Sequence, residues 1–302
     1  MVGYILRRIF YMILMLLLIS FIAFAIIQAM PGSILDYIHI YSEEDVKTYG
    51  LNQPFLVQYG KWLSRLLHLD FGIAGNGMPV SAVLFTEGAK WFYSLIIICA
   101  TMLFAWPLGI AIGICSALWQ NSLWDRIALF ISVFGIALPN FLLALFLSWI
   151  LYRGLGIPPV GNKFQLEFLW LYILVIGSAS IISIMRHMRS NLIDVLTTDY
   201  IRTARAKGLR EHVILKHGVR NAINPLISML GFYIPTLFEG MIVAAAIFNI
   251  PIIERAYLEA FKNQDPYVIA TGLLFFGIIL LAGNLLADLL LLMNDPRIRY
   301  EG

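Results

Sequence analysis

Long apolar runs separated by polar segments dominate the chain. Six runs are long enough to cross a bilayer, because about 20 residues at roughly 1.5 Å rise per residue cover a hydrocarbon core of about 30 Å. The pattern therefore predicts an all-α polytopic membrane protein with six transmembrane helices. The six spans lie at approximately residues 9–29, 93–118, 127–152, 168–186, 223–248 and 267–292.

The first run follows two arginines, as the apolar core of a secretory signal does. It extends from Ile9 to Met30, which is the length of a full span, and the sequence "QAMPG" that follows is a poor cleavage site. We interpret residues 1–30 as an N-terminal transmembrane helix that is not removed.

Three prolines, Pro107, Pro139 and Pro235, fall inside predicted spans. Proline removes a backbone donor and disturbs a helix, and a membrane span tolerates this where neighbouring helices or water satisfy the freed carbonyl groups. Two interpretations stay open: ordinary kinks in a helical bundle, or breaks that shape a pathway.

The composition supports the membrane assignment, with 60% hydrophobic and 13% charged residues. Soluble domains have about 45–50% apolar and about 25% charged residues. With six spans both termini share one side, and 13 of the 21 Lys and Arg residues lie on that side, against 8 on the other. The positive-inside rule then places both termini in the cytoplasm, and we expect a bacterial plasma membrane.

The segment 31–92 is predicted to be extracytoplasmic and to contain amphipathic helices. Ser42 is a candidate helix cap with Asp45 three residues later, and Pro54 occupies a first-turn position. The sequence "GIAGNGMPV" predicts a turn. An apolar stripe at helical spacing predicts a helix that lies on the bundle or on the membrane surface, formed by Phe55, Tyr59, Trp62, Leu63 and Leu66.

Two cysteines, Cys99 and Cys115, lie far apart in one apolar run. A straight helix cannot bridge that spacing, so we interpret both as buried small apolar residues without a disulfide. The five histidines show no convincing ligand spacing, and no metal site is predicted.

The stretch "DYIRTARAKGL", residues 199–209, is basic and rich in small residues within an otherwise apolar chain. Thr198 and Asp199 favour a helix start, and Gly208 favours its end. The small side chains of Ala204 and Ala206 would let another surface approach the backbone. A docking helix for a partner and a basic loop that touches anionic lipid both fit this pattern, with the small residues slightly favouring docking.

Several motifs in the same order as in a known family cover nearly the whole chain. They include "YGLNQPFLVQYGKWLSRLLHLDFG", "ALPNF", "MRSNLIDVLTTDYIRTARAKGL", "HGVRNAINPLI", "IFNIP" and "NLLADLLLLMNDPRIR". In these motifs the chain resembles the permeases of ABC importers, in the form carried by the dipeptide, oligopeptide and nickel branch. The resemblance implies the type I importer permease fold, with a five-helix transmembrane core at 93–302 that contains a cytoplasmic coupling loop at 187–222.

The resemblance also implies partners: a second homologous permease subunit, two cytoplasmic ATPase subunits and an extracytoplasmic substrate-binding protein. This chain has no GxxxxGK[ST] sequence, so we expect no enzyme activity in it, with ATP and Mg bound by the ATPase subunits and no cofactor bound here. The substrates implied are short peptides, or nickel and metal chelates, moved inward by alternating access. The residues implied to contact an ATPase subunit are Asp199, Tyr200, Arg202, Thr203, Ala204, Arg205, Ala206, Lys207, Gly208 and Leu209.

The chain departs from the family pattern after the fifth span. Ala245 stands where the family usually has a glutamate, and Ile252 stands where it usually has a glycine. These departures put in doubt any inference about gating at the outer end of that span.

Polar residues within the spans are candidates for the transport pathway, because intramembrane carboxylates are costly. Glu239 could serve either in helix packing or in the pathway, and both roles stay open. For Asp288 a contact that holds two helices together is favoured over a transport role, and for Asn284 a hydrogen bond between helices is favoured. These carboxylates also leave open an ion- or proton-coupled transporter that acts alone. The sequence shows no nucleophile motif that would indicate a membrane enzyme. The basic loop is too short to indicate nucleic-acid binding.

Overall fold

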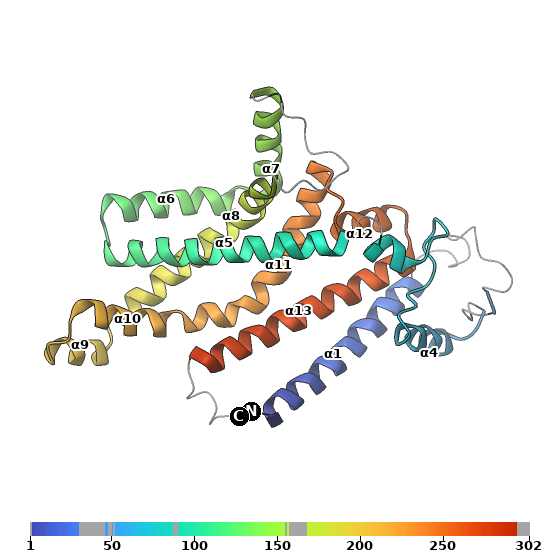
Figure 1. Cartoon of the computed structure of the whole chain (residues 1–302), viewed down its shortest axis with the longest axis horizontal. Coiled ribbons are helices and arrows are strands. Elements are labelled where there is room, and N and C mark those ends of the chain that lie inside the picture. The colour runs from blue at the N-terminus through green and yellow to red at the C-terminus, as the bar shows by residue number, and fades with distance from the viewer. Residues whose placement is uncertain are drawn as a thin grey trace. The chain divides into compact units, whose positions relative to one another are not determined.

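The structure, a computed structural model, describes residues 2–29, 46–47, 50, 52–86, 90–154, 156 and 168–294 (Figure 1). Within these ranges the regular secondary structure is helical, joined by turns and short irregular connections, with one isolated antiparallel bridge between Ile73 and Pro79 in the predicted turn. The all-α prediction is confirmed. The helices are α1 (Val2–Ala29), α4 (Phe55–Leu66), α5 (Lys90–Leu118), α6 (Leu123–Ala137), α7 (Asn140–Trp149), α8 (Leu169–Leu196), α9 (Asp199–Ala206), α10 (Glu211–Ala222), α11 (Asn224–Phe248), α12 (Ile253–Lys262) and α13 (Pro266–Asn294), with short π-helical turns η1 (Ala82–Thr86) and η2 (Ile150–Gly154).

Five helical stretches are long and apolar enough to cross a membrane, and a sixth span is possible if a bent pair counts as one. The stretches are Arg7–Ile26, Trp91–Leu118, Leu169–Leu196, Glu211–Phe248 and Pro266–Asn294. The bent pair, α6 with α7 and η2, covers the third predicted span.

The third predicted span is not one straight helix, because the chain turns by 96° between α6 and α7. Leu138 is extended, at φ −86° and ψ 111°, and Pro139 precedes the first residue of α7. A residue before proline is driven out of the α region, and proline lacks the N–H that would continue the ladder. Pro107 and Pro235, in contrast, lie inside the continuous helices α5 and α11.

The chain divides into two compact units. Unit 1 comprises Met1–Leu95, Asn162–Phe164 and Ile250–Leu281, and unit 2 comprises Ile96–Gly161, Gln165–Asn249 and Ala282–Gly302.

In unit 1 the predicted amphipathic helix α4 packs on α1. Pro54 is its N-cap, Trp62 is fully buried, and Phe24 of α1 stacks within 5.4 Å of the Trp62 ring. Tyr59 and Ser20 share a hydrogen bond of 2.8 Å between their hydroxyl groups. The stripe predicted from the sequence therefore faces α1. Ser42 and Asp45 lie outside the described residues.

In unit 2 the long helix α8 is the central element, packed by α6, α7, α10 and α11. It also lies close to α5 at two glycines: a Cβ at Gly109 would lie 2.9 Å from the Ile181 carbonyl oxygen, and one at Gly113 would lie 2.7 Å from that of Met185. The buried core below this contact includes Ile184, Met188, Leu192, Ala222, Leu226 and Tyr233.

Two details differ from the sequence interpretation. Cys99 and Cys115 are free, as expected, but both are exposed rather than buried. They lie on the surface of α5, which is apolar all round, so the sequence gives no period from which to choose its packed face. Helix α8 also continues to Leu196, ten residues beyond the predicted end of the fourth span, and takes up the start of the predicted loop.

Candidate functional site

The basic stretch forms the short helix α9, as the sequence predicts. Thr198 is the N-cap, Asp199 lies in the first turn and Arg205 lies in the last turn. A negative charge at the N-terminus and a positive charge at the C-terminus both interact favourably with the helix dipole. The helix ends in a Schellman motif, in which the Gly208 N–H donates to the Arg205 carbonyl at 2.9 Å and the Leu209 N–H donates to that of Ala204 at 3.2 Å. Gly208 has a positive φ of 74°, which glycine adopts without strain.

Helix α9 is fixed by a small part of its surface. The Ile201 side chain is 1% exposed, and the Tyr200 hydroxyl accepts a hydrogen bond of 2.8 Å from the Asn221 amide on α10. Ala204 is half-buried. The remaining residues named from the sequence are exposed: Asp199, Arg202, Thr203, Arg205, Ala206, Lys207, Gly208 and Leu209.

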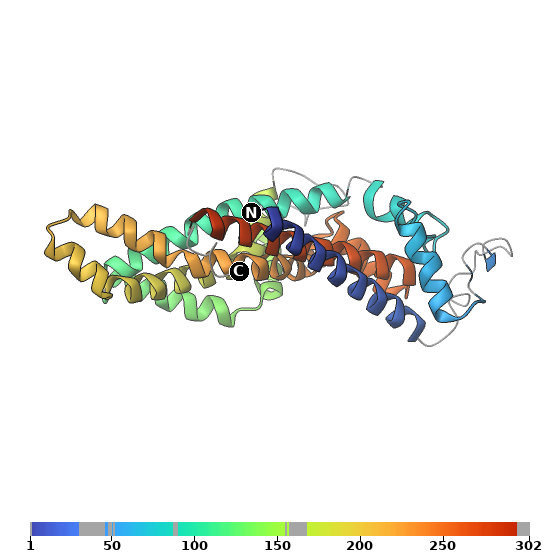
Figure 2. The ribbon, with the colours of Figure 1, turned by 90° about the horizontal axis from the view of Figure 1, so that it is seen from below.

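Space is open beside Gly208, where an added Cβ would meet no atom within 4 Å. The small residues Ala206 and Gly208 thus lie on a bare part of the hairpin formed by α9 and α10. Both views show this hairpin at one end of unit 2 (Figures 1 and 2).

Helix α10 connects the hairpin to the membrane helices. Ile214, Gly218 and Ala222 are buried, and a Cβ at Gly218 would lie 3.3 Å from the Leu196 side chain of α8. The Asn191 amide of α8 donates to the Ala222 carbonyl at 3.2 Å. Two residues, Thr197 and Thr198, connect α8 to α9, and only Ile223 separates α10 from α11. Short connections therefore link α9 to α8 on one side and, through α10, to α11 on the other.

A buried ion pair holds α8 to the turn between α5 and α6. The Asp125 side chain is 2% exposed and accepts from Arg189 Nε at 2.7 Å and from Arg189 Nη2 at 2.9 Å. Ser116 Oγ and the Asn121 N–H also donate to this carboxylate. A bidentate, fully hydrogen-bonded pair has a fixed geometry, so α5, α6 and α8 are locked together ten residues before α9 begins.

Sequence reasoning missed this pair. Nothing in the sequence distinguishes Arg189 from the other basic residues on the predicted inner side, and Asp125 lies 64 residues away from it. The available signal was Ser122, three residues before Asp125, which caps α6 by accepting from the Asp125 N–H at 3.2 Å.

The three candidate pathway residues occupy different environments in unit 2. Asn284 of α13 lies against α11, where a Cβ added at Gly231 would overlap its Oδ1 atom. Asp288 is half-buried on α13, and Glu239 is exposed on α11. Asn284 and Asp288 lie four residues apart on α13, and Glu239 lies on α11.

Glu239 belongs to an exposed stripe of α11. Phe232, Thr236, Glu239 and Ala246 are exposed and Val243 is half-buried, at spacings of three and four residues, while the intervening faces are buried. The Ala245 side chain, at the position where the sequence departs from the family pattern, faces the buried side.

A buried carboxyl group in unit 1 was also missed. Glu254 follows Ile252, the second departure, and is 0% exposed. Its Oε2 accepts from Ser94 Oγ at 2.7 Å, and its Oε1 has no hydrogen-bond partner among the described residues. Burial raises the pKa of Glu254 to about 7. A glutamate beside apolar residues in a short helix gives no such signal in the sequence.

The described residues include no group of three or more His, Cys, Asp or Glu side chains that could hold a metal ion.

Comparison with known proteins gives a consistent result. Residues 109–300 match the family described as "Binding-protein-dependent transport system inner membrane component". The chain is 35% identical to the oligopeptide transport system permease protein AppB of Bacillus subtilis, over 99% of this chain and 100% of that protein. It is 33% identical to the glutathione transport system permease proteins GsiC of Salmonella paratyphi A and of Pectobacterium atrosepticum, over the full length of both chains in each case.

The matched region contains the bent pair, α8, the α9–α10 hairpin and the stripe of α11, so the helices that carry the candidate site are those the family shares. The predicted type I importer permease fold is thereby confirmed. The chain belongs to the binding-protein-dependent transport system inner membrane component family, as a multi-pass ABC importer permease of the peptide branch.

Proposed function

We propose that this chain is the permease subunit of an ATP-driven importer of short peptides. The relatives named above are permeases for oligopeptides and for glutathione, a short peptide, which supports this substrate class. Nickel and metal chelates are the alternative substrates, and competition in an uptake assay separates the two classes.

The observation that carries the proposal is the construction of α9. It is anchored by Ile201 and by the hydrogen bond between Tyr200 and Asn221, most of its remaining surface is exposed, and short connections link it to α8 and, through α10, to α11. Such a helix suits a groove on a cytoplasmic ATPase subunit, one for this chain and one for a second, homologous permease. ATP and Mg are bound and used by those subunits, and both termini of this chain lie in the cytoplasm.

The same connections support alternating access. When ATP draws the ATPase subunits together, the motion of α9 passes to α10, and from α10 to α8 at the contact between Gly218 and Leu196 and to α11 across Ile223. The Asp125–Arg189 pair makes α5 and α6 move with α8. The spans then tilt as a group, and hydrolysis resets them.

The exposed stripe of α11 supports a second permease subunit. A charged side chain such as Glu239 is costly against lipid. We infer that the stripe faces the partner permease and the pathway between the two subunits. An extracytoplasmic binding protein delivers the peptide to its outer end.

The test is to block the surface of α9 without unfolding it. Ala206→Trp places a large side chain on the bare surface at an ordinary helical position, and it should abolish uptake and co-purification of the ATPase subunits. His217→Trp, an exposed position on α10, is the matched control and should retain both. Gly208→Asn separates backbone strain from contact, because asparagine tolerates a positive φ and should retain partial uptake.

Uptake by Ala206→Trp at the normal rate would refute the coupling role. Uptake by the purified chain alone in liposomes, driven by an ion gradient without ATP, would instead identify a stand-alone secondary transporter.

A further inference from the structure

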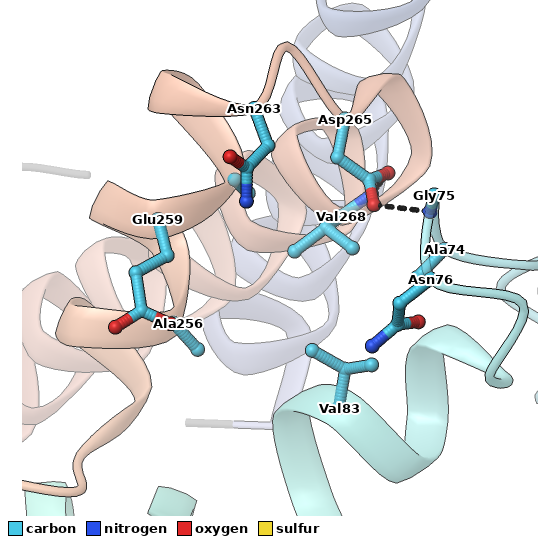
Figure 3. Close-up of a pocket in the computed structure, with 10 residues that line it drawn as sticks. Ala74, Gly75, Asn76, Val83, Ala256, Glu259, Asn263, Asp265 and Val268 are labelled. Atoms are coloured by element: carbon cyan, nitrogen blue, oxygen red, sulfur yellow. Dashed lines mark hydrogen bonds between the residues drawn. The ribbon is translucent and has the colours of Figure 1, made fainter. Parts of the chain in front are cut away.

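A pocket of about 300 Å³ opens in unit 1 between the turn at residues 72–80 and helix α12 (Figure 3). Its walls come from segments that are distant in sequence but that both lie between spans on the predicted outer side. The lining residues are Ala74, Gly75, Asn76, Val83, Ala256, Glu259, Ala260, Asn263, Asp265 and Val268.

The pocket has an apolar floor and a polar rim. Figure 3 shows Glu259 of α12 and Asn263, the residue after α12, on one side and Asn76 of the turn on the other. The Asn76 Oδ1 accepts from the Met78 N–H at 3.0 Å, which fixes the amide. Alanine and valine side chains lie between these polar groups.

Two carboxylates line the pocket, and none of the lining residues within the described ranges is basic. Asp265 is 8% exposed, and its oxygens accept from the Gly75 N–H at 2.6 Å and the Val268 N–H at 3.2 Å. Burial raises its pKa, since no lysine or arginine among the described residues pairs with it. A cation in the pocket would therefore be stabilised by a carboxylate that has been removed from water.

Glu259 supplies the second charge at the pocket mouth. Its side chain is 54% exposed, and its Oε1 accepts from Arg255 Nε at 2.9 Å. Arg255 does not line the pocket, and a carboxylate can accept more hydrogen bonds than this one contact uses. Glu259 can thus bind a second cation, in competition with Arg255.

We propose that this pocket receives a lysine or arginine side chain from the extracytoplasmic binding protein when that protein docks. The aliphatic stem would lie on the floor formed by Ala74, Val83 and Ala260, and the charged head would meet Glu259 and Asp265. The volume is at the lower end of the range for ligand pockets, which suits one side chain. This inference rests on the proposed function, because it requires a binding protein as partner.

The test measures the dissociation constant of the transporter's own binding protein for the complete transporter, with its ATPase subunits, in lipid nanodiscs. Glu259→Gln should weaken binding about tenfold and reduce its salt dependence. Arg255→Gln should leave binding unchanged or tighten it, because it frees Glu259. Ala260→Phe should weaken binding by filling the pocket. Asp70→Asn removes a carboxylate from the same outer segment outside the pocket, and it should have no effect.

Equal weakening by Glu259→Gln and Arg255→Gln would show that their ion pair is only structural, and would overturn the proposal. So would an unchanged dissociation constant in both Glu259→Gln and Ala260→Phe, or binding of a free short peptide in the pocket without the binding protein. If the wild-type transporter retains its ATPase subunits but binds no such protein, the receptor part of the proposed function fails as well.

Discussion

Glu254 shows how far a single residue can depart from its ordinary chemistry in this fold. It is fully buried, with one hydrogen bond from Ser94 to Oε2 and none to Oε1 among the described residues. Removing a carboxylate from water favours its protonated form. The contact that Glu254 makes between the start of α5 and α12 is therefore most stable when the carboxyl group is neutral.

This residue predicts a pH dependence of stability. The pKa of Glu254 rises from 4.5 to about 7 on folding, so the folded state binds more protons between these values. Stability should be unaffected by this group below about pH 4.5, should fall as the pH rises from there to about 7, and should level off above. At 1.4 kcal/mol per pKa unit the loss is about 3 kcal/mol. About 2 kcal/mol of this loss falls between pH 5.5 and pH 8, and thermal unfolding of the purified protein at these two pH values measures it.

Glu254→Gln is the control, because it keeps the hydrogen bond from Ser94 and cannot ionise. This variant should be more stable than the wild-type chain at pH 8 and should lose most of the pH dependence in this range. Asp265, whose pKa is also raised by burial, contributes in the same direction and remains in both proteins. Identical pH profiles for the two proteins would contradict the prediction.

At the level of helices, the Asp125–Arg189 pair should stabilise the contact between the α5–α6 turn and α8. Asp125→Leu alone leaves a partly buried guanidinium without its carboxylate, and breaking a buried pair in this way costs about 3–5 kcal/mol. Asp125→Leu with Arg189→Leu removes both charges and should cost much less than the sum of the single changes. A double-mutant cycle on unfolding free energies measures the coupling.

The exposed pair Arg255–Glu259, at 2.9 Å, is the matched control. It makes one contact where Asp125–Arg189 makes two, and it lies in water, so its coupling should be about 0.3–0.5 kcal/mol. Equal coupling energies for the two pairs would show that burial adds nothing. A role of the pair in transport is tested separately. Without the pair α5 and α6 should no longer move with α8, so the Asp125 variants should hydrolyse more ATP per peptide transported.

The helices differ in how well the sequence predicts them. Helix α9 could be predicted closely, because its cap, its charges and Gly208 are local signals. The amphipathic stripe of α4 was equally clear, since polar residues mark the opposite face. The packed face of α5 could not be predicted, because nearly every position is apolar, and Cys99 and Cys115 were therefore misplaced. Kinks and breaks stayed open for all three prolines, and the sequence does not show that the chain turns at Pro139 while Pro107 and Pro235 lie inside continuous helices.

At the scale of the whole protein, the long apolar runs and the composition predicted the class, and the order of motifs predicted the family. The Asp125–Arg189 and Ser94–Glu254 contacts could not be predicted, because they join residues 64 and 160 positions apart. Neither pair has a local pattern that names its partner. The pocket beside α12 depends on a similar long-range contact, between Asp265 and Gly75.

The proposed assembly predicts which face of α11 meets water. Thr236→Cys, in a background where Cys99 and Cys115 are alanine, should react with a membrane-impermeant thiol reagent in the assembled transporter, and its rate should change when ATP is added. Leu237→Cys, on the buried face, should stay protected. Labelling is followed by mass spectrometry.

Reaction of Thr236→Cys only with a lipid-soluble maleimide would show that the stripe faces the bilayer. The transport pathway would then lie elsewhere in the assembly, and Glu239 would have to be protonated or paired with a polar group to face lipid.

The right-angled turn between α6 and α7 has a consequence for how the protein enters the membrane. At such a break the carbonyl groups that end one helix and the N–H groups that begin the next have no partners within their own segments. Hydrocarbon cannot solvate them. We therefore expect that α6 and α7 do not insert into the bilayer as one straight helix. They pack on α8 and α11, so we expect this region to reach its final fold only after those later helices have been synthesised.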